Sequence, residues 1–178
     1  MIPGEGVDLG ALHQAIIDAI AGQFPGLATV TDYPDKRAAV AMPACLIEIV
    51  DFEAEPDPGT GQLALLGRFS ARLLIGFRTP DTEREIRRLA GAVAVFVHQQ
   101  RWGHAISPAE VTSIAPDAFD VDLDKITVWA VEWQQVLNLG DPAWSNDGTI
   151  PTEILFSFDP DIGIPHEPDY RPLNGITV

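Results

Sequence analysis

The sequence predicts an α+β fold, in which two helices pack on one face of a mainly antiparallel sheet of four to five strands. Two segments carry apolar residues at helical spacing, and several shorter segments are β-branched or alternate between apolar and polar residues. They follow the order helix, hairpin, helix, hairpin, which is typical of a single sheet covered by helices. A chain of 178 residues with 46% hydrophobic content is long enough for one buried core.

The first helix is expected over about residues 8–24, where Leu9, Leu12, Ile16 and Ile20 recur at helical spacing. Asp8 is placed as its N-cap, and Pro25-Gly26 ends it. The second helix is expected over about residues 80–100. The run Thr79-Pro80-Asp81-Thr82-Glu83 supplies an N-cap, a proline at the first helical position and acidic residues in the first turn. Its apolar stripe consists of Ile86, Leu89, Ala90, Val93, Phe96 and Val97.

Strands are predicted where apolar and polar residues alternate or β-branched residues cluster. Residues 44–53 form a β-branched run, and residues 68–78 alternate cleanly between apolar and polar side chains. The stretch between them, residues 54–62, is rich in proline and glycine and is typical of the tip of a long hairpin. The remaining expected strands are a short one within the turn-rich residues 26–43, one near 111–115 and one over 125–138, the last two joined by an acidic turn.

The composition changes after residue 139, so residues 1–139 are predicted to form the α+β domain and residues 140–178 an extended C-terminal arm. Prolines and acidic residues are frequent in this arm, and Arg171 is its only basic residue. The arm is therefore not expected to build its own core. Its one apolar run, residues 152–158, contains Ile154, Phe156 and Phe158 and is strand-like. Such a segment needs a sheet edge or groove, either on a neighbouring subunit or on its own domain.

The charge balance excludes several classes of partner. There are 26 acidic and 11 basic residues, which give a formal net charge of -15. This surface repels phosphate backbones and anionic membranes, so specific nucleic-acid binding is not expected. No stretch is long and apolar enough to span a bilayer and the N-terminal residues lack a leader pattern, so we expect a soluble intracellular product. The single cysteine, Cys45, is expected to be a small buried hydrophobe that forms no internal disulfide.

The candidate ligand motifs are incomplete. Gly59-Thr60-Gly61 lies between two strands, whereas a nucleotide loop precedes a helix. Acidic residues spaced like a calcium loop are Asp117, Asp120, Asp122 and Asp124. However, Lys125 stands where that loop needs glycine and Val131 where it needs glutamate, so we interpret this stretch as a solvated acidic turn. His98 and His104 do not share a helical face, and we expect neither a metal nor a cofactor.

Catalysis has no support in the sequence either. No nucleophile elbow surrounds any serine, and we predict that the chain is not an enzyme. The tryptophans are the remaining candidates for a ligand cage; they are Trp102, Trp129, Trp133 and Trp144. Alternate aromatic residues on a strand are more often core or interface side chains, and a ligand pocket also needs convergent polar groups. Packing is therefore the favoured interpretation.

The order of elements carries a resemblance over about residues 8–139. The stretches that carry it are 12–20, the strand Leu46-Ile47-Glu48-Ile49, the run 67–75 and the helix 84–90. A helical opening, an Ile/Val strand, a Pro/Gly hairpin tip, an Arg-bearing second strand and a capped helix together resemble phage tail terminator (tail completion) proteins. The resemblance is one of pattern and register.

The resemblance implies a structural virion protein without a cofactor. Members of this family are small α+β subunits that close into a hexameric ring on the tail tube, stop its polymerisation and offer a surface to the head connector. It implies self-association as a homo-hexamer, contact with the tail tube protein and possible contact with sheath and connector proteins. DNA would pass through the lumen without specific binding, and the protein would be assembled in the host cytoplasm into the neck end of the virion tail.

In a ring of this kind, the candidate interface residues would have the following positions. Glu55 and Asp57 at the hairpin tip would face the lumen or the tube and repel DNA. Arg68 and Arg72 share one strand face and would meet acidic groups of the adjacent subunit; the alternative is an ordinary solvated sheet face. Two other functions stay open. One is another head-tail joining, neck or baseplate component, and the more distant one is a small-ligand-binding or enzymatic domain with a pocket near the tryptophans.

Overall fold

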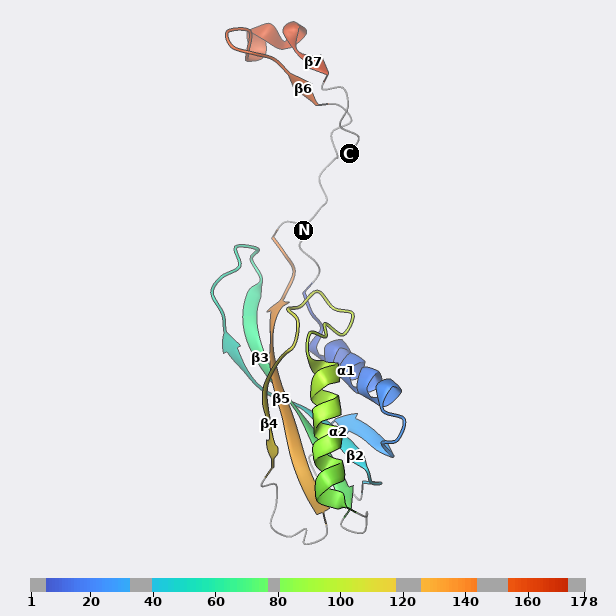
Figure 1. Ribbon diagram of the computed structural model, residues 1–178. Coiled ribbons are helices and arrows are strands. Elements are labelled where there is room, and N and C mark those ends of the chain that lie inside the picture. The colour runs from blue at the N-terminus through green and yellow to red at the C-terminus, as the bar shows by residue number, and fades with distance from the viewer. Residues whose placement is uncertain (1–5, 33–39, 77–80, 118–125, 144–153, 173–178) are drawn as a thin grey trace. The chain divides into compact units, whose positions relative to one another are not determined.

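The computed structural model describes residues 6–32, 40–76, 81–117, 126–143 and 154–172. The chain divides into two compact units, Met1–Trp144 and Ser145–Val178. Within the described residues, the first unit carries two α-helices and five strands, and the second carries a short 3-10 helix and two very short strands. Figure 1 shows these elements along the chain.

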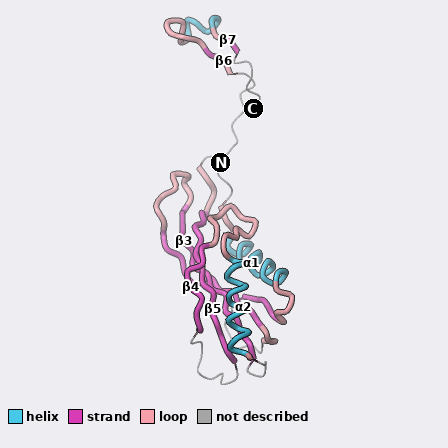
Figure 2. The backbone as a smooth tube through the Cα atoms, viewed as in Figure 1, coloured by secondary structure: helices cyan, strands magenta, loops and turns pink. Residues whose placement is uncertain are grey.

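The first unit is built on a five-stranded sheet with the strand order β1-β2-β3-β5-β4. Figure 2 shows the strands in magenta. Its strands are β1 (Thr29–Asp32), β2 (Ala44–Ala54), β3 (Leu63–Gly76), β4 (Glu110–Pro116) and β5 (Ile126–Leu139). Neighbouring strands are antiparallel except β1 and β2, which run parallel. The predicted α+β class and mainly antiparallel sheet are confirmed, but β1 makes the sheet mixed. Residues 33–43 separate β1 from β2 in the sequence.

Helix α1 (Leu9–Gln23) begins and ends close to the predicted residues. The Asp8 carboxylate accepts a hydrogen bond from the Ala11 N–H at 2.7 Å, so Asp8 is the N-cap that the sequence predicts. At the other end, the Phe24 N–H donates to the Ile20 carbonyl at 2.9 Å, directly before Pro25-Gly26. The helix buries one stripe of side chains, Leu12, Ile16 and Ile20.

Helix α2 (Thr82–Val97) is shorter at both ends than predicted. Asp81 precedes it with a φ of 54°, and the helix starts at Thr82, so the prediction of a start at Pro80 is wrong. Thr79 and Pro80 themselves lie outside the described residues. The predicted acidic first turn is confirmed, with Glu83 and Glu85. The helix ends before Gln100 because Gln99 has a φ of 69°, which turns the chain so that its N–H donates to the Ala109 carbonyl at 2.8 Å.

Both α-helices contribute to one hydrophobic core, together with one face of the sheet (Figure 1). The core takes alternate side chains from β3, and its fully buried members there include Phe69, Ala71 and Leu73. Phe69 stacks on Trp133 of β5, with ring centroids 5.5 Å apart and planes 10° apart. This arrangement fixes which face of β3 points away from the helices.

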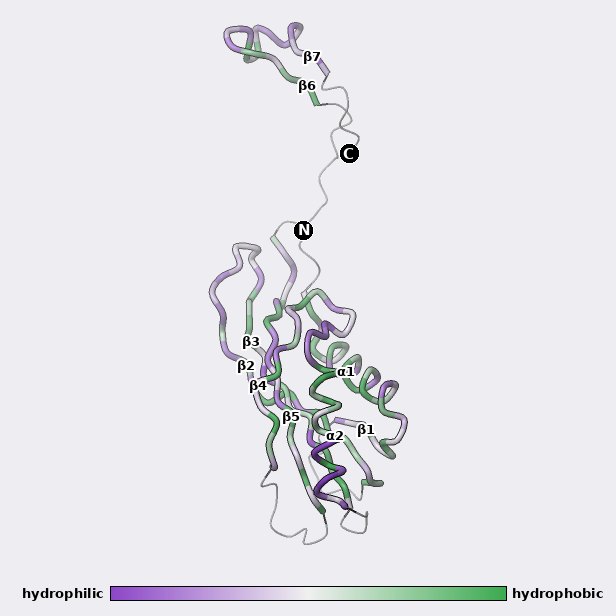
Figure 3. Tube along the Cα trace, viewed as in Figure 1, coloured by the Kyte–Doolittle hydropathy of each residue, from purple (hydrophilic) through white to green (hydrophobic). Residues whose placement is uncertain are grey.

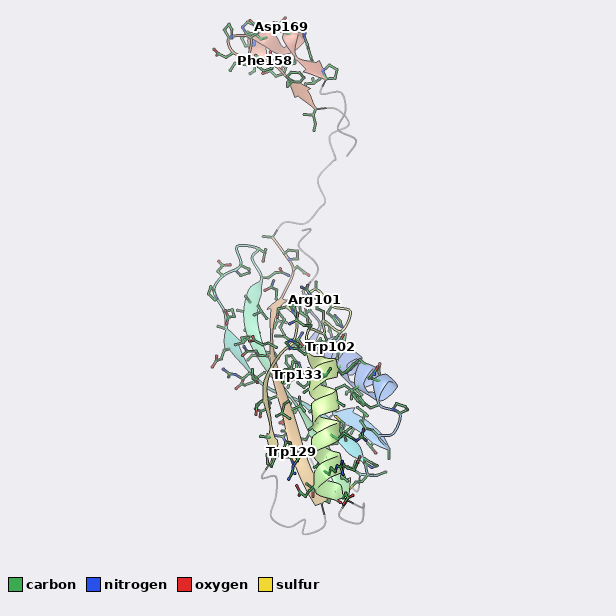
Figure 4. The ribbon with its side chains drawn as sticks, viewed as in Figure 1. Arg101, Trp102, Trp129, Trp133, Phe158 and Asp169 are labelled. Atoms are coloured by element: carbon green, nitrogen blue, oxygen red, sulfur yellow. The ribbon has the colours of Figure 1, made fainter. Side chains whose placement is uncertain are left out.

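A buried amide joins the core to the connection that follows α2. The Gln135 side chain is 1% exposed, and its Oε1 accepts hydrogen bonds from the indole N–H groups of Trp102 at 2.7 Å and Trp133 at 3.2 Å (Figure 4). Its Nε2 donates to the carbonyls of Gln100 at 3.0 Å and Ser107 at 2.8 Å. All four hydrogen-bonding positions of the amide are therefore used, and the loop after α2 is held against β5.

Strands β2 and β3 form the long antiparallel hairpin that the sequence predicts. At its tip, Gly59 and Gly61 have φ values of 72° and 77°, a region that favours glycine. The tip is held to residues after β5, because Gln62 Nε2 donates to the Gly140 carbonyl at 2.8 Å. A Cβ at Gly61 would lie 3.0 Å from the Ala143 Cβ, so this close approach also favours glycine.

The second unit contains a few short secondary-structure elements. Strands β6 (Leu155–Phe156) and β7 (Arg171–Pro172) pair antiparallel, and the 3-10 helix η1 (Ile164–Asp169) lies between them in sequence. Within the apolar run predicted to be strand-like, residues 152 and 153 lie outside the described residues, and pairing is confined to Leu155 and Phe156. The Tyr170 hydroxyl accepts from the Gly163 N–H at 3.0 Å across η1.

The Gln135 amide generates a stability prediction. Replacing Gln135 with leucine leaves two indole N–H groups and two carbonyls without a partner, so the free energy of unfolding is expected to fall by about 3 kcal/mol. Urea unfolding followed by tryptophan fluorescence measures this. Ser70→Ala is the matched control, because the buried Ser70 hydroxyl has no hydrogen-bond partner among the described residues and its removal should cost nothing. Equal losses in the two variants would contradict the role given to Gln135.

Candidate interaction surfaces

Two ion-pair clusters occupy the sheet face that points away from the helices. In the first, Arg72 of β3 lies between β2 and the end of β4. Its Nε donates to the Asp117 carboxylate at 2.7 Å, and its Nη1 pairs with the Glu48 carboxylate. The three side chains are only 21 to 32% exposed. Partial burial lowers the pKa of Arg72, but the hydrogen bonds to Glu48 and Asp117 outweigh it and hold that pKa above the ordinary guanidinium value.

The second cluster is more open to solvent. Arg68 contacts both oxygens of Asp51 at 3.1 Å and Glu53 at 2.8 Å, and these side chains are 41 to 59% exposed. Hydrogen bonds to Glu53 and Asp51 raise the pKa of Arg68. Both arginines that the sequence analysis assigned to a subunit interface are thus engaged by acidic side chains of their own sheet.

The rest of this face is apolar at one end. A small cluster of buried residues sits there, consisting of Ala44, Leu46, Leu74 and Val128, with Val40 and Ile126 packed against it. Between this cluster and Arg68 lies Ser70, which is 1% exposed and stands in register between Glu48 and Glu132. The described part of this face therefore combines charge pairs with apolar side chains that are already buried within the chain.

The hairpin tip carries the predicted acidic residues, but one of them has a local role. The Asp57 carboxylate accepts from the Gly59 N–H at 2.8 Å, so it stabilises the turn. The Glu55 N–H donates to the Ala64 carbonyl at 2.9 Å and continues the ladder beyond β2. Exposed apolar side chains accompany the hairpin; they are Val50, Phe52 and Leu63.

The second unit exposes most of its apolar side chains. None of residues 154–172 is buried. Phe158 is 76% exposed and meets Phe156 edge to face, with ring centroids 5.7 Å apart (Figure 4). The other large exposed apolar residues there are Ile154, Leu155, Ile162 and Ile164. The three predicted arm residues therefore lie on one small unit, within which Ile154 and Phe158 are exposed and Phe156 is partly buried.

A groove that sequence reasoning missed runs between the end of α1 and the first half of α2. Its volume is about 330 Å³, and the side chains that form its apolar walls include Phe24, Leu27 and Leu89. Glu85 and Arg88 line its α2 side and pair with each other at 2.9 Å. In Figure 3 the first turns of α2 are strongly hydrophilic, so the groove joins an apolar wall to a charged rim.

The structure also places the residues that were weighed as ligand sites. Trp102 and Trp133 are buried, and their N–H groups are used by Gln135, so packing accounts for both; Trp144 lies outside the described residues. Asp117 pairs with Arg72, while Asp120, Asp122 and Asp124 lie outside the described residues. In the part of the chain that the structure describes, no group of three or more His, Cys, Asp and Glu residues is arranged to hold a metal.

The remaining sequence expectations concern single residues and the membrane. Cys45 is fully buried in the core, as predicted, and burial raises the pKa of its thiol to about 12. His98 is the exposed residue that directly follows α2. Among the described residues, no helix has the length and apolar content needed to cross a membrane.

Comparison with known proteins gives no relative: no protein-family model matches the chain, and no curated protein matches it.

The two ion-pair clusters predict different responses to mutation. Replacing Arg72 with methionine leaves Glu48 and Asp117 partly buried without their cation, and the free energy of unfolding should fall by about 1 to 2 kcal/mol. Arg68→Met is the matched control on the same strand and face; its exposed pairs should contribute much less and weaken further in high salt. Urea unfolding at low and high salt measures both. A larger loss for Arg68→Met would contradict this ranking.

The buried thiol predicts a pH dependence. Because burial raises the folded pKa of the Cys45 thiol from its ordinary value of 9.0 to about 12, its contribution to stability is complete below pH 9.0 and is lost as the pH rises toward 12. Unfolding free energies at about pH 8 and about pH 10.5 should therefore differ by up to roughly 1.4 kcal/mol per pH unit above 9 from this group. The Cys45→Ala variant should lack this part of the decline. Identical pH profiles for the two proteins would refute the assignment.

Proposed function

We propose that this chain is a structural subunit that works by packing against copies of itself and neighbouring proteins, as a tail terminator does. In this role it caps the phage tail tube as a closed ring, ends tube polymerisation and provides the joint to the head connector. The single observation that carries the proposal is the second unit, in which five large apolar side chains are exposed and none of residues 154–172 is buried.

Exposed apolar surface of this kind favours a protein partner. A unit that buries none of its described side chains gains little hydrophobic stabilisation on its own. Clusters of exposed large apolar residues commonly mark protein–protein contact sites. Six acidic residues lie among residues 145–178, against one arginine, which disfavours nucleic acid or an anionic membrane as the partner. Docking on another protein subunit would remove this surface from water, and docking on the chain's own first unit is the alternative.

The fold of the first unit supports ring formation. Its sheet ends in two different strands, β1 and β4, so the two edges are not alike. Contacts between unlike surfaces of successive copies are heterologous, and they give either a closed ring or an open filament. The order of elements, with α1 and α2 on one face of the sheet and a long β2–β3 hairpin, fits the terminator-like layout that the sequence resembles. A closed hexameric ring is the form that this resemblance implies.

The charge of the chain fits a channel that DNA passes through. The net charge is -15, and Glu55 and Asp57 lie at the hairpin tip. Negative groups that line a channel repel the phosphate backbone and prevent it from binding. Lumenal placement of the tip is part of the proposal, together with assembly in the host cytoplasm and contact with the tail tube protein.

Two alternatives have different consequences. Another head-tail joining, neck or baseplate component would also self-associate and would share the exposed second unit. A small-ligand-binding domain is favoured by one observation, the groove of about 330 Å³ beside α2, a volume in the range of small-molecule pockets. A ligand that fills this groove raises the midpoint of thermal unfolding, whereas a surface that only packs against protein gives no such shift with small apolar compounds.

The proposal predicts the mass of the protein in solution. Light scattering at several concentrations and at low and high salt should give a species of about six times the 19.3 kDa chain mass, with no larger series at high concentration. A closed ring stops growing when its last interface forms, so the mass should reach a plateau. A strict monomer at all concentrations, or a mass that grows without limit, would contradict the ring.

A further inference from the structure

Two aromatic side chains of the second unit, Phe156 and Phe158, lie against each other, and Phe158 is exposed. The ring centroids of Phe158 and Phe156 are 5.7 Å apart, and Phe158 remains 76% exposed. Asp159 is the next residue in the sequence, and Asp161 follows after Pro160. The chain is fixed around this point, because the Ser157 hydroxyl donates to the Asp161 carbonyl at 2.6 Å. The result is an aromatic side chain on an ordered turn with two carboxylates beside it.

The groove on the first unit has the complementary chemistry. Phe24, Leu27 and Leu89 give it apolar walls, and Arg88 on its rim is 73% exposed at the side chain. Arg84 lies one turn earlier on α2 and is exposed, and it forms no ion pair among the described residues. Because Glu85 pairs with Arg88, Arg84 is the cation beside this apolar surface that keeps its charge uncompensated among the described residues.

We propose that the α1–α2 groove of one copy receives the Phe158 turn of a second copy. This inference rests on the proposed function, because its partner is another subunit of the same assembly. Charge complementarity selects a second copy. Described residues of the second unit carry four acidic groups against Arg171. The first half of α2 carries three arginines against Glu83 and Glu85, so the two surfaces keep net charges of opposite sign. Phe158 would enter the apolar part of the groove, and Asp159 and Asp161 would meet Arg84 and Arg88.

A contact of this kind would also limit the number of copies in the assembly. The groove and the Phe158 turn are different surfaces, so a pair of copies joined through them still has one free groove and one free turn. Each added copy repeats the same contact until the last turn meets the first groove. A ring closed in this way leaves no exposed Phe158, and it uses the apolar surface that the second unit cannot bury alone.

Disulfide cross-linking between two differently tagged full-length chains tests the contact. One chain carries Leu89→Cys in the groove and the other carries Phe158→Cys. Mild oxidation should join them into a heterodimer that reducing agent releases, because the contact raises the effective concentration of the two thiols. The native Cys45 is fully buried and does not compete in the folded protein. Ile114→Cys on β4 replaces Leu89→Cys as the matched control, since Ile114 is 45% exposed and does not line the groove.

The expected result is at least ~10-fold more heterodimer for the Leu89 pair than for the Ile114 pair, as an effective concentration in the millimolar range requires. Equal yields would overturn the inference. So would cross-linking that occurs only within one chain carrying both Leu89→Cys and Phe158→Cys. Light scattering on the same samples separates the two proposals. Closed oligomers without the selective cross-link refute the groove contact alone, whereas monomers refute both the groove contact and the ring.

Discussion

The alternation of side chains along β3 is the constraint on which the rest of the structure depends. β3 pairs with β2 on one side and β5 on the other along most of its length, so its two faces are fixed at once. Phe69, Ala71 and Leu73 point into the helix layer, and Arg68, Ser70 and Arg72 point away from it. A shift of one residue would bury two arginines under the helices and expose Phe69, which makes the register strongly specified.

This constraint explains which groups of the molecule have partners within the chain and which do not. On the helix side, Gln135 satisfies two indole groups and two carbonyls, so the core is closed without an unpaired polar group there. On the other side, the arginines of β3 are satisfied by Glu48, Asp51, Glu53 and Asp117, and the surface is therefore largely self-contained. Among the described residues, the groove beside α2 and the exposed apolar side chains of the second unit still lack a protein contact, as do Val50, Phe52 and Leu63 on the hairpin.

Sequence patterns predicted the helices and strands in which apolar residues recur at the spacing of the buried side chains. The alternation within residues 68–78 arises because one face of β3 packs under the helices and the other carries Arg68 and Arg72. Residues 9–20 follow helical spacing because α1 buries one stripe. The first part of β3 was missed, since Leu63 to Gly67 is an unbroken apolar run without alternation. The start of α2 was misplaced because the left-handed φ of Asp81 leaves no mark in composition. The parallel pairing of β1 depends on a contact with β2 and not on its own four residues.

The candidate surfaces were predictable to different degrees. The exposed apolar run with Ile154, Phe156 and Phe158 was visible in the sequence, because apolar residues stand out in an acidic, proline-rich segment. The partners of Arg72 were not, since Glu48 and Asp117 are 24 and 45 residues away and meet it only through strand register. The groove was invisible as well, because it is formed by the turn after α1 packing near α2 and carries no local motif.

We propose that copies of the chain assemble through two unlike surfaces. This proposal predicts the shape of the assembly more directly than the affinity between its subunits. Electron microscopy of the purified full-length protein tests it most directly, because a closed ring has a fixed number of subunits and a visible lumen. The account predicts uniform rings with sixfold symmetry and an open centre. Particles of single-chain size at all concentrations, or open filaments of variable length, would contradict it.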